Sequence, residues 1–307
     1  MRRKLPELGE VPTIGEYEVL HPHENRVSGK DQRGNMGRPD ISVITVCFNA
    51  AKTIAATIES IAAQTDVPNV EYIVVDGGST DGTIEILRSR PDVITYWISE
   101  PDRGISDAFN KGIALATAPI VTHLNADDTA GPGHLAAALK LLADHPEAGF
   151  CHGDMRIVTA DGKVRREIRG THDYRVGIER RMTVNHPTTV VRKAIYNSYG
   201  LFRRELKYAM DYDLIYRLAN ARIPGAYSSS LIASMRDEGV SNTQWRAATK
   251  DLQAIQIANG ASPMKISMLG WGLHLRIIVR NALEIHGFTG IAATLRKLSN
   301  IGSGKPR

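Results

Sequence analysis

The apolar positions in the first half of the chain alternate between two patterns, one typical of buried strands and one typical of amphipathic helices. Residues 41–48 (ISVITVCF) and 70–76 (VEYIVVD) are short apolar runs rich in β-branched residues, which favour strands. Between them, Ile54, Ile58 and Ile61 recur at helical spacing and would lie on one face of a helix. The same order then repeats, with helices expected near residues 83–88 and 105–116 and strands near 93–98 and 119–124.

Strands that alternate with helices predict a parallel sheet, because a strand returns beside its predecessor through a crossover helix. We therefore expect an α/β fold with a mostly parallel central sheet and helices on both faces. Ligands bind to such sheets beyond the carboxyl ends of the strands, so the loops there are candidate sites. Three of these loops are polar, namely FNAAKT from residue 48, DGGSTDGT at residues 76–83 and NADDT at residues 125–129.

The two ends of the chain have different patterns. Residues 1–40 are polar and rich in proline, glycine and charge, which predicts a flexible or loosely docked arm. Beyond residue 150 the alternation loosens into a hairpin around Asp161-Gly162 and a helix from about residue 211 to residue 222. From Trp245 onward the pattern is mostly helical.

Composition and charge limit the class of protein. The chain has 307 residues, a formal net charge of +5 and 42% hydrophobic residues, which is sufficient for one or two globular domains. Its basic residues are scattered and do not form a stripe beside aromatic residues, so we expect no nucleic-acid binding. Cys47 and Cys151 have no partners at disulfide-framework or zinc-finger spacing. Without a signal-peptide core or a run of about 18 apolar residues, the chain is expected to be cytoplasmic and not membrane-spanning.

The loop at residues 76–83 places an acid at a strand end and two glycines in the following turn. Asp76 could accept hydrogen bonds from a nucleotide base or ribose, and the glycines would let a ligand approach the backbone closely. Alternatively, the segment is a tight turn in which Thr80 or Asp81 caps the next helix. Neither the dinucleotide fingerprint G-x-G-x-x-G nor the phosphate loop G-x-x-x-x-G-K-[ST] is present.

The NADD segment, Asn125 to Asp128, follows the next apolar run. Adjacent carboxylates repel unless a cation lies beside them, and Mg²⁺ or Mn²⁺ would supply that charge while also binding phosphate oxygens. Alternatively, Asp127 or Asp128 precedes a helix near His134 and complements its dipole. The occurrence of two such loops at successive strand ends favours the metal.

A third acidic pair, Asp211 and Asp213, lies in the segment AMDYDLIYRL. The two residues are two positions apart, so a helix would direct them to different faces. One carboxylate could point into the crevice and act as a general base that deprotonates an acceptor hydroxyl. Alternatively, both acids only complement the dipole at a helix start.

The ordered set of motifs resembles the family 2 glycosyltransferases, which have the GT-A fold. The matching segments are VCFN, VVDGGSTDGT, SEPDRGISDAFNKGI, LNADD, NHPTTVVRKAIYNSYGLF, MDYDLIYRL and EGVSNT. They occur in the family's order from Ile41 to about Thr243. The resemblance implies a nucleotide-sugar-binding half over residues 41–150 and an acceptor-side half over residues 151–243. The helical pattern, which the resemblance does not cover, predicts a C-terminal helical extension over residues 244–307.

The resemblance also implies roles for residues of the donor half. Asp76 matches the acid that binds the nucleotide base, and Asn49 lies in the first nucleotide-contacting loop. Asp107 matches a position that lines the same pocket. All three are therefore expected to contact the nucleotide sugar.

Asn125 and Asp127 match the two acids of the family's D-x-D motif, with Ala126 between them in the same nucleotide-sugar-binding loop. In the family the second acid is the metal ligand, so Asp127 is the expected ligand of a divalent Mg²⁺ or Mn²⁺. The replacement of the first acid by Asn125 removes a negative charge but keeps an oxygen acceptor.

In the acceptor half, Asp211 matches the aspartate of the family's E-D motif, which is the general base, while Met210 replaces the glutamate. His186 either lines the acceptor site or is a partly buried histidine bonded to backbone. Arg236 begins a segment that resembles a cover over the donor, where it would meet the diphosphate or remain a surface arginine.

The resemblance implies an inverting transferase that moves a sugar from a nucleoside diphosphate sugar to a glycan or lipid-linked acceptor, in bacterial cell-surface polysaccharide or glycolipid synthesis. The alternatives are a sugar nucleotidyltransferase, disfavoured because FNAAKT lacks a phosphate loop, and a non-catalytic nucleotide-sugar-binding protein. Apolar residues recur beside basic ones between Leu269 and Ile301. They predict peripheral contact with the inner face of a membrane, or a helix packed on the catalytic domain or on a second subunit.

Overall fold

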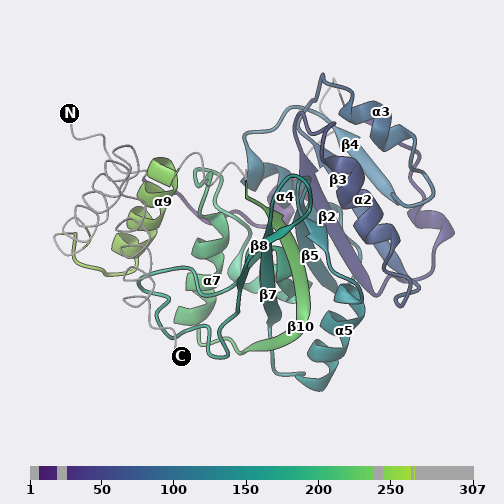
Figure 1. Ribbon diagram of the computed structural model, residues 1–307. Helices are drawn as coiled ribbons and strands as arrows, with labels where there is room; N and C mark the ends of the chain where they lie inside the picture. Colours follow the sequence, from purple (N-terminus) through teal and green to yellow (C-terminus); the bar gives the residue numbers. More distant parts are fainter. Residues whose placement is uncertain (1–6, 19–25, 238–244, 264–265, 267–307) are drawn as a thin grey trace, which may run out of the picture. The chain divides into compact units, whose positions relative to one another are not determined.

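A computed structural model describes residues 7–18, 26–237, 245–263 and 266 (Figure 1). The chain divides into two compact units, residues 1–254 and residues 255–307. The EGVSNT segment and the membrane-contact helix predicted between Leu269 and Ile301 lie outside the described residues.

The first unit is built on one ten-stranded sheet. Its strands are β1 (Val27–Ser28), β2 (Ile41–Cys47), β3 (Val70–Asp76), β4 (Tyr96–Ser99), β5 (Ile120–Asn125), β6 (Thr129–Ala130), β7 (Phe150–Val158), β8 (Val164–Ile168), β9 (Val190–Arg192) and β10 (Gly225–Arg236). They follow the order β1-β4-β3-β2-β5-β9-β7-β10-β6, and β8 pairs with β7 outside this path. Because β2, β3, β4 and β5 pair in parallel, as do β7 and β10, the predicted mostly parallel sheet is confirmed.

Helices cover both faces of this sheet. The helices of the described residues are α1 (Gly15–Glu18), α2 (Ile54–Ala62), α3 (Thr83–Arg88), α4 (Ile105–Leu115), α5 (His134–Asp144), α6 (Lys193–Tyr199), α7 (Met210–Asn220) and α9 (Trp245–Ala258), with short 3-10 turns η1 (Arg33–Asn35) and η2 (His186–Thr188). On one face, α2 buries the predicted stripe against a core that includes Val43 of β2. The next residue, Ile44, points to the other face, where a Cβ added at Gly112 of α4 would lie 2.3 Å from Ile44 Cγ2. A glycine at that position therefore lets α4 pack closely on the strand.

Several strands differ from the expectation, and β1, β6 and β10 are among those that the sequence did not predict. The strand expected near residues 93–98 begins only at Tyr96, because the N–H groups of Val93 and Ile94 bond to the carbonyl of Arg90 and close a turn after α3. The three-residue strand β9 was not anticipated. It lies antiparallel between β5 and β7, and three residues are too few to produce a recognisable alternation.

The described part of the first 40 residues packs on the domain, which corrects the expectation of a loosely docked arm. Ile14 and Tyr17 are buried, and β1 pairs with the edge strand β4. The Tyr17 hydroxyl donates a 2.9 Å hydrogen bond to Asp107 of α4. These few apolar residues give an otherwise polar segment enough buried surface to dock.

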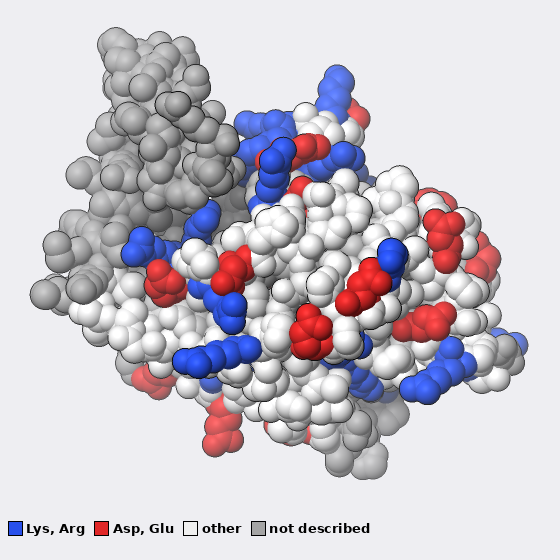
Figure 2. Space-filling view, turned by 90° about the horizontal axis from the view of Figure 1, so that it is seen from below, with Lys and Arg blue, Asp and Glu red and all other residues white. Residues whose placement is uncertain are grey.

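The helical pattern expected from Trp245 onward is present in α9, the last long helix of the described residues. Its Asp251 carboxylate accepts hydrogen bonds from the backbone N–H groups of Lys207 and Tyr208, at 3.1 and 3.0 Å. Among the described helices, none has the length and apolar character that crossing a bilayer requires. On the face of the molecule in Figure 2, basic side chains are interspersed with acidic ones over the described surface.

Acid should weaken the fold through His123, which is buried on β5 among aromatic rings. Burial lowers the pKa of His123 from 6.5 to about 3, so between these pH values the unfolded chain binds a proton that the folded chain does not. The free energy of unfolding should therefore fall as the pH falls. His123→Gln removes this titration, and urea unfolding in this range should show a pH dependence that is less steep by up to about 1.4 kcal/mol per pH unit.

The matched control is His145→Gln, because the His145 side chain is 49% exposed. This variant should keep the part of the pH dependence that His123 contributes, because His123 is unchanged. Equal slopes for the wild type and His123→Gln would contradict the assignment.

Candidate active site

The candidate site begins at the edge where four neighbouring strands end. Cys47 lies opposite Asp76, Asp76 opposite Ser99, and Val46 opposite Asn125 in the parallel registers of β2 to β5. The three polar loops expected from the sequence therefore emerge at one edge of the sheet, as the rule for parallel sheets predicts.

Asn49 joins the first two loops. It adopts a left-handed backbone conformation with φ of 51°, which asparagine tolerates better than most residues. Its N–H donates to the Ser79 hydroxyl at 2.7 Å, and its side-chain Oδ1 accepts from the N–H of Thr80 at 3.0 Å. Asn49 thus shapes the loop surface on which a ligand would lie.

Asp76 lies at the predicted strand end, but its carboxylate is fully buried beneath the loops. One oxygen accepts bonds from the N–H groups of Gly78 and Ser79 and from the Ser99 hydroxyl, at 3.1, 2.8 and 2.6 Å. The other accepts from the Ser79 hydroxyl and from the Cys47 thiol. Asp76 therefore organises the turn from below, and contact with a ligand would require it to give up one of these bonds.

Two residues that the sequence reasoning did not single out lie above this turn. Phe48 is 65% exposed, the most exposed of the large apolar side chains in the described residues. The Asp102 carboxylate reaches over Gly77, where an added Cβ would lie 2.6 Å from Asp102 Oδ2. Burial raises the pKa of Asp102, and its bond from the Gly104 N–H opposes that shift. The sequence feature that could have identified Asp102 is the PDRG turn after β4. Asp102 is the acid of this turn, and it occupies the space left by the missing side chain of Gly77.

Asp107 lies near the start of α4 and points inward. It accepts hydrogen bonds from the Tyr17 hydroxyl and from the Arg103 N–H, at 2.9 and 3.2 Å, and lies 3.8 Å from Arg204. Its side chain is only 8% exposed. These contacts attach the N-terminal segment and the α4 start to one another, and they leave little of Asp107 for a ligand.

The NADD segment does not cap a helix, since α5 begins at His134 with Gly133 as its N-cap residue. Instead, Asn125 Nδ2 donates to Asp128 Oδ2 at 3.1 Å. In the described part of the chain, the side-chain oxygen of Asn125 and the second carboxylate oxygen of Asp128, Oδ1, are buried without a hydrogen-bond partner. Ala126, between them, is buried. Buried oxygens without a hydrogen-bond donor are energetically costly. The NADD segment is therefore the part of this edge whose oxygens lack a donor or a cation.

A divalent cation fits this oxygen-rich segment. Burial raises the pKa of Asp127 and, together with the Asp127 charge, raises that of Asp128 well above its usual range. A cation would favour both charged forms, and Mg²⁺ or Mn²⁺ prefers such oxygen ligands. Within residues 7–18, 26–237 and 245–263, no three His, Cys, Asp or Glu side chains form a complete metal cluster, so phosphate oxygens would complete the coordination. The positive charge of Arg236 acts on Asp127 from β10.

The structure places His186 beside Asp211. His186 Nδ1 and Asp211 Oδ2 are 3.8 Å apart, with the two side chains 16% and 25% exposed. Burial lowers the pKa of His186, and the Asp211 charge opposes this shift. The ring stacks near His123, with centroids 6.4 Å apart. His123 and Asn125 are two residues apart on β5 and share a face, so the pair lies on the face of the sheet that bears Asn125.

Asp213 has a different environment from Asp211. Its carboxylate is 2% exposed and pairs with Arg203 at 3.2 Å and Arg217 at 3.0 Å. Arg217 lies one turn further along α7, and Arg203 lies in the segment before this helix. The two guanidinium groups explain why a charged group is tolerated inside. Of the two acids, only Asp211 faces the site.

Solved structures with the same fold are GT-A glycosyltransferases. The mannosyltransferase PcManGT from Pyrobaculum calidifontis, in complex with GDP-Man and Mn²⁺, is 20% identical with a TM-score of 0.56, covering 95% of this chain and 87% of its own. S. aureus TarS 1–349, in complex with UDP-GlcNAc, is 19% identical with a TM-score of 0.55, covering 74% of this chain and 69% of its own. The predicted GT-A architecture is therefore confirmed.

Relatives by sequence point the same way. An uncharacterized glycosyltransferase of Mycobacterium tuberculosis is 40% identical over 106 residues, which is 34% of this chain and 40% of the relative's length. A PGL/p-HBAD biosynthesis glycosyltransferase of Mycobacterium bovis is 28% identical over 68% of this chain and 81% of its own length. The succinoglycan biosynthesis protein ExoU of Rhizobium meliloti is 29% identical, with 72% and 69% covered.

The model of the family described as glycosyl transferase family 2 matches residues 42–205. This span covers more than half of the 307 residues and includes the loops at the ends of β2 to β5. The chain therefore belongs to glycosyl transferase family 2.

Proposed function

We propose that this chain transfers a sugar from a nucleoside diphosphate sugar to a hydroxyl group of a glycan or lipid-linked acceptor, with inversion at the anomeric carbon. The main support is one juxtaposition. The orphaned oxygens of the NADD segment and the Asp211–His186 pair lie on the same face of the sheet. A cation-bound diphosphate would therefore lie on one side of the transferred sugar, and a carboxylate base would lie on the other.

The nucleotide would lie on the loops after β2, β3 and β4. Phe48 offers an exposed ring against which a base can stack, and the Asp102 carboxylate beside it can accept a hydrogen bond from a base N–H. Asn49 and Asp76 hold the loops in place beneath. The two structural neighbours, one with UDP-GlcNAc and one with GDP-Man, support a nucleotide-sugar donor of this kind.

Asp127, with the oxygens of Asn125 and Asp128 close by, would hold a divalent cation, Mg²⁺ or Mn²⁺. When bound, the cation supplies positive charge for the departing diphosphate. The guanidinium of Arg236 is close enough to act on Asp127, and there it can bind a phosphate oxygen of the diphosphate.

Asp211 would act as the general base. Its carboxylate removes the proton of the acceptor hydroxyl as that oxygen attacks the anomeric carbon, and the bond between this carbon and the diphosphate oxygen breaks. A single displacement inverts the configuration. His186 keeps one edge of the carboxylate in position, so that the other edge remains free for the acceptor.

The setting would be the synthesis of a bacterial cell-surface polysaccharide or glycolipid on the cytoplasmic side of the membrane. The relatives named for PGL/p-HBAD and succinoglycan biosynthesis support this setting.

Binding of a nucleoside diphosphate should require both the metal and Asp127. With Mn²⁺ present, UDP or GDP should raise the melting temperature of the wild type, because a ligand that binds only the folded state stabilises it by mass action. Asp127→Ala, or excess EDTA, should remove most of this shift and nearly all transfer. Thermal melting and an assay of released nucleoside diphosphate measure the two effects.

The control for this prediction is Asp144→Ala, because Asp144 is an exposed acid on α5 that pairs only at the surface with Lys140. It should keep the shift and the turnover. Full turnover of Asp127→Ala, or of the wild type in EDTA, would exclude the metal role.

Asp211→Asn should lower the transfer rate, whereas Asp213→Asn should lower the stability of the fold. Asp211→Asn should keep Mn²⁺-dependent nucleotide binding and lose roughly 10²- to 10⁴-fold in transfer rate, because only the base is lost. Asp213→Asn leaves two buried guanidinium groups without their carboxylate, so the free energy of unfolding should fall by about 3 to 5 kcal/mol. Urea unfolding and single-turnover rates on the same preparations separate the two. A folded, inactive Asp213→Asn beside an active Asp211→Asn would overturn the assignment of the base.

A further inference from the structure

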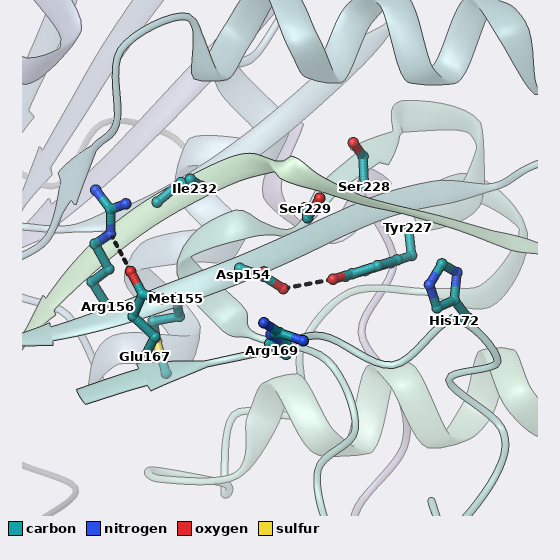
Figure 3. A pocket seen from close by; sticks show the side chains of 10 residues that line it. All are labelled: Asp154, Met155, Arg156, Glu167, Arg169, His172, Tyr227, Ser228, Ser229 and Ile232. Atoms are coloured by element: carbon teal, nitrogen blue, oxygen red, sulfur yellow. Dashed lines mark hydrogen bonds and ion pairs between the residues drawn. The ribbon is translucent and has the colours of Figure 1, made fainter. Parts of the chain in front are cut away.

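A hollow lies on the acceptor-side half, away from the loops that would hold the nucleotide. It has a volume of about 650 Å³ and is formed by β7, β8, β10 and the segment after β8 (Figure 3). Its polar lining includes Asp154, Arg156, Glu167, Arg169, His172 and Tyr227. The size is within the range of ordinary ligand sites.

A bulge in β10 shapes this hollow. Tyr227 lies opposite His152 and Ile232 opposite Asp154, so five steps along β10 match two steps along β7. The intervening residues leave the ladder, and Ser228 and Ser229 line the hollow. A bulge of this kind redirects side chains and is common next to functional sites.

The charges of the lining are matched in number, with two arginines and two acids. Arg156 pairs with Glu167 at 3.0 Å. Asp154 accepts bonds from the Tyr227 hydroxyl and the Gly170 N–H, both at 2.8 Å and both on Oδ1. Its Oδ2 therefore faces the hollow as a hydrogen-bond acceptor. Arg169 forms no hydrogen bond or ion pair with another residue that the structure describes, so its guanidinium remains available as a donor.

An aromatic wall completes the hollow. The rings of His172 and Tyr227 lie edge to face with centroids 4.4 Å apart, and Figure 3 shows them at the same end as Asp154 and Arg169. A carboxylate acceptor, a guanidinium donor and an aromatic ring together suit a ligand with adjacent hydroxyl groups and an apolar C–H face. Without net positive charge, the lining does not favour a phosphate.

The hollow borders the proposed catalytic pair. Asn185, the residue before His186, donates from Nδ2 to the carbonyls of Gly153 and Ile168, at 2.8 and 3.1 Å. Gly153 directly precedes Asp154, and Ile168 directly precedes Arg169. The turn that bears His186 is therefore bonded to the backbone from which the two key side chains of the hollow project.

The geometry points to a saccharide-binding pocket, in which Asp154 and Arg169 bind the hydroxyl groups of an uncharged sugar of the acceptor beside the Tyr227 ring. This inference rests on the proposed function, because it identifies the acceptor as a molecule that already contains sugar. The hydrogen bonds of Asn185 connect this pocket to the turn that bears His186.

The test is titration of the full chain with neutral disaccharides, namely cellobiose, maltose, lactose and mannobiose, followed by saturation-transfer-difference NMR. Glucuronic acid and inorganic phosphate serve as charged probes. Phosphate has no carbon-bound protons, so its binding is measured by competition with the disaccharide signal. At least one neutral disaccharide should bind saturably and more tightly than either charged probe. Arg169→Ala should weaken that binding about ten- to a hundred-fold, the effect of losing a hydrogen bond from a charged group.

Arg166→Ala is the matched control. Like Arg169, Arg166 is exposed, but it lies within β8. It is next in sequence to Glu167, which lines the hollow, and therefore points to the opposite face of the strand. It should leave disaccharide binding unchanged. Since Arg169 is exposed and bonds to no described residue, its variant should fold, which the Mn²⁺-dependent melting shift with UDP or GDP verifies.

Saturable binding of a neutral disaccharide that depends on Arg169 and not on Arg166 supports the pocket. Absence of saturable binding by every neutral disaccharide, preference for phosphate or glucuronic acid, or equal effects of the two substitutions overturns it. If saccharide binding fails while metal-dependent nucleotide binding persists, only this inference fails. Loss of nucleotide binding by the wild type would instead overturn the proposed function.

Discussion

The candidate site depends on the insertion of β9 between β5 and β7. The donor-side strands and the acceptor-side strands each form parallel ladders, and β9 joins them through antiparallel hydrogen bonds to both. This junction makes one continuous sheet, with one continuous face. Asn125 of β5 and Asp154 of β7 come to share that face, and η2, which leads directly into β9, places His186 on it. A second connection is the antiparallel pairing of β6, directly after the NADD segment, with β10.

The buried acids around this face have different environments, and the differences separate structural residues from candidate functional ones. Asp76 is satisfied by backbone and hydroxyl donors, and Asp213 is neutralised by two guanidinium groups. Asp127 and Asp128 are compensated less: the Arg236 charge acts on Asp127 and Asn125 donates a bond to Asp128, but burial still raises the pKa of both carboxyl groups. A folded chain retains such a cost only where a ligand offsets it or where function requires it. The electrostatic deficit therefore lies where the family's metal motif is expected.

The polar character of the acceptor side is consistent with a surface that recognises hydroxyl groups. Its β10 bulge, the Asp154–Tyr227 bond and Arg169, which bonds to no other described residue, adjoin backbone that is hydrogen-bonded to Asn185, the residue before His186. Recognition and proton transfer would then depend on the same backbone hydrogen bonds. An enzyme built in this way positions its acceptor relative to its base without a separate moving element.

The sequence alone determined the repeated strand–helix order, the polar loops at strand ends and the acidic motifs, because apolar periodicity and local turn chemistry are properties of neighbouring residues. It even separated Asp211 from Asp213, since helical spacing directs them apart. It did not show that the Asp76 carboxylate would be bonded within its own turn, or that Asp102 would fill the space over Gly77. Nor did it show that the described part of the first 40 residues would dock through Tyr17. Each of these outcomes depends on contacts between segments far apart in the chain. Only the tertiary structure could decide them, because burial and partner choice arise when those segments pack together.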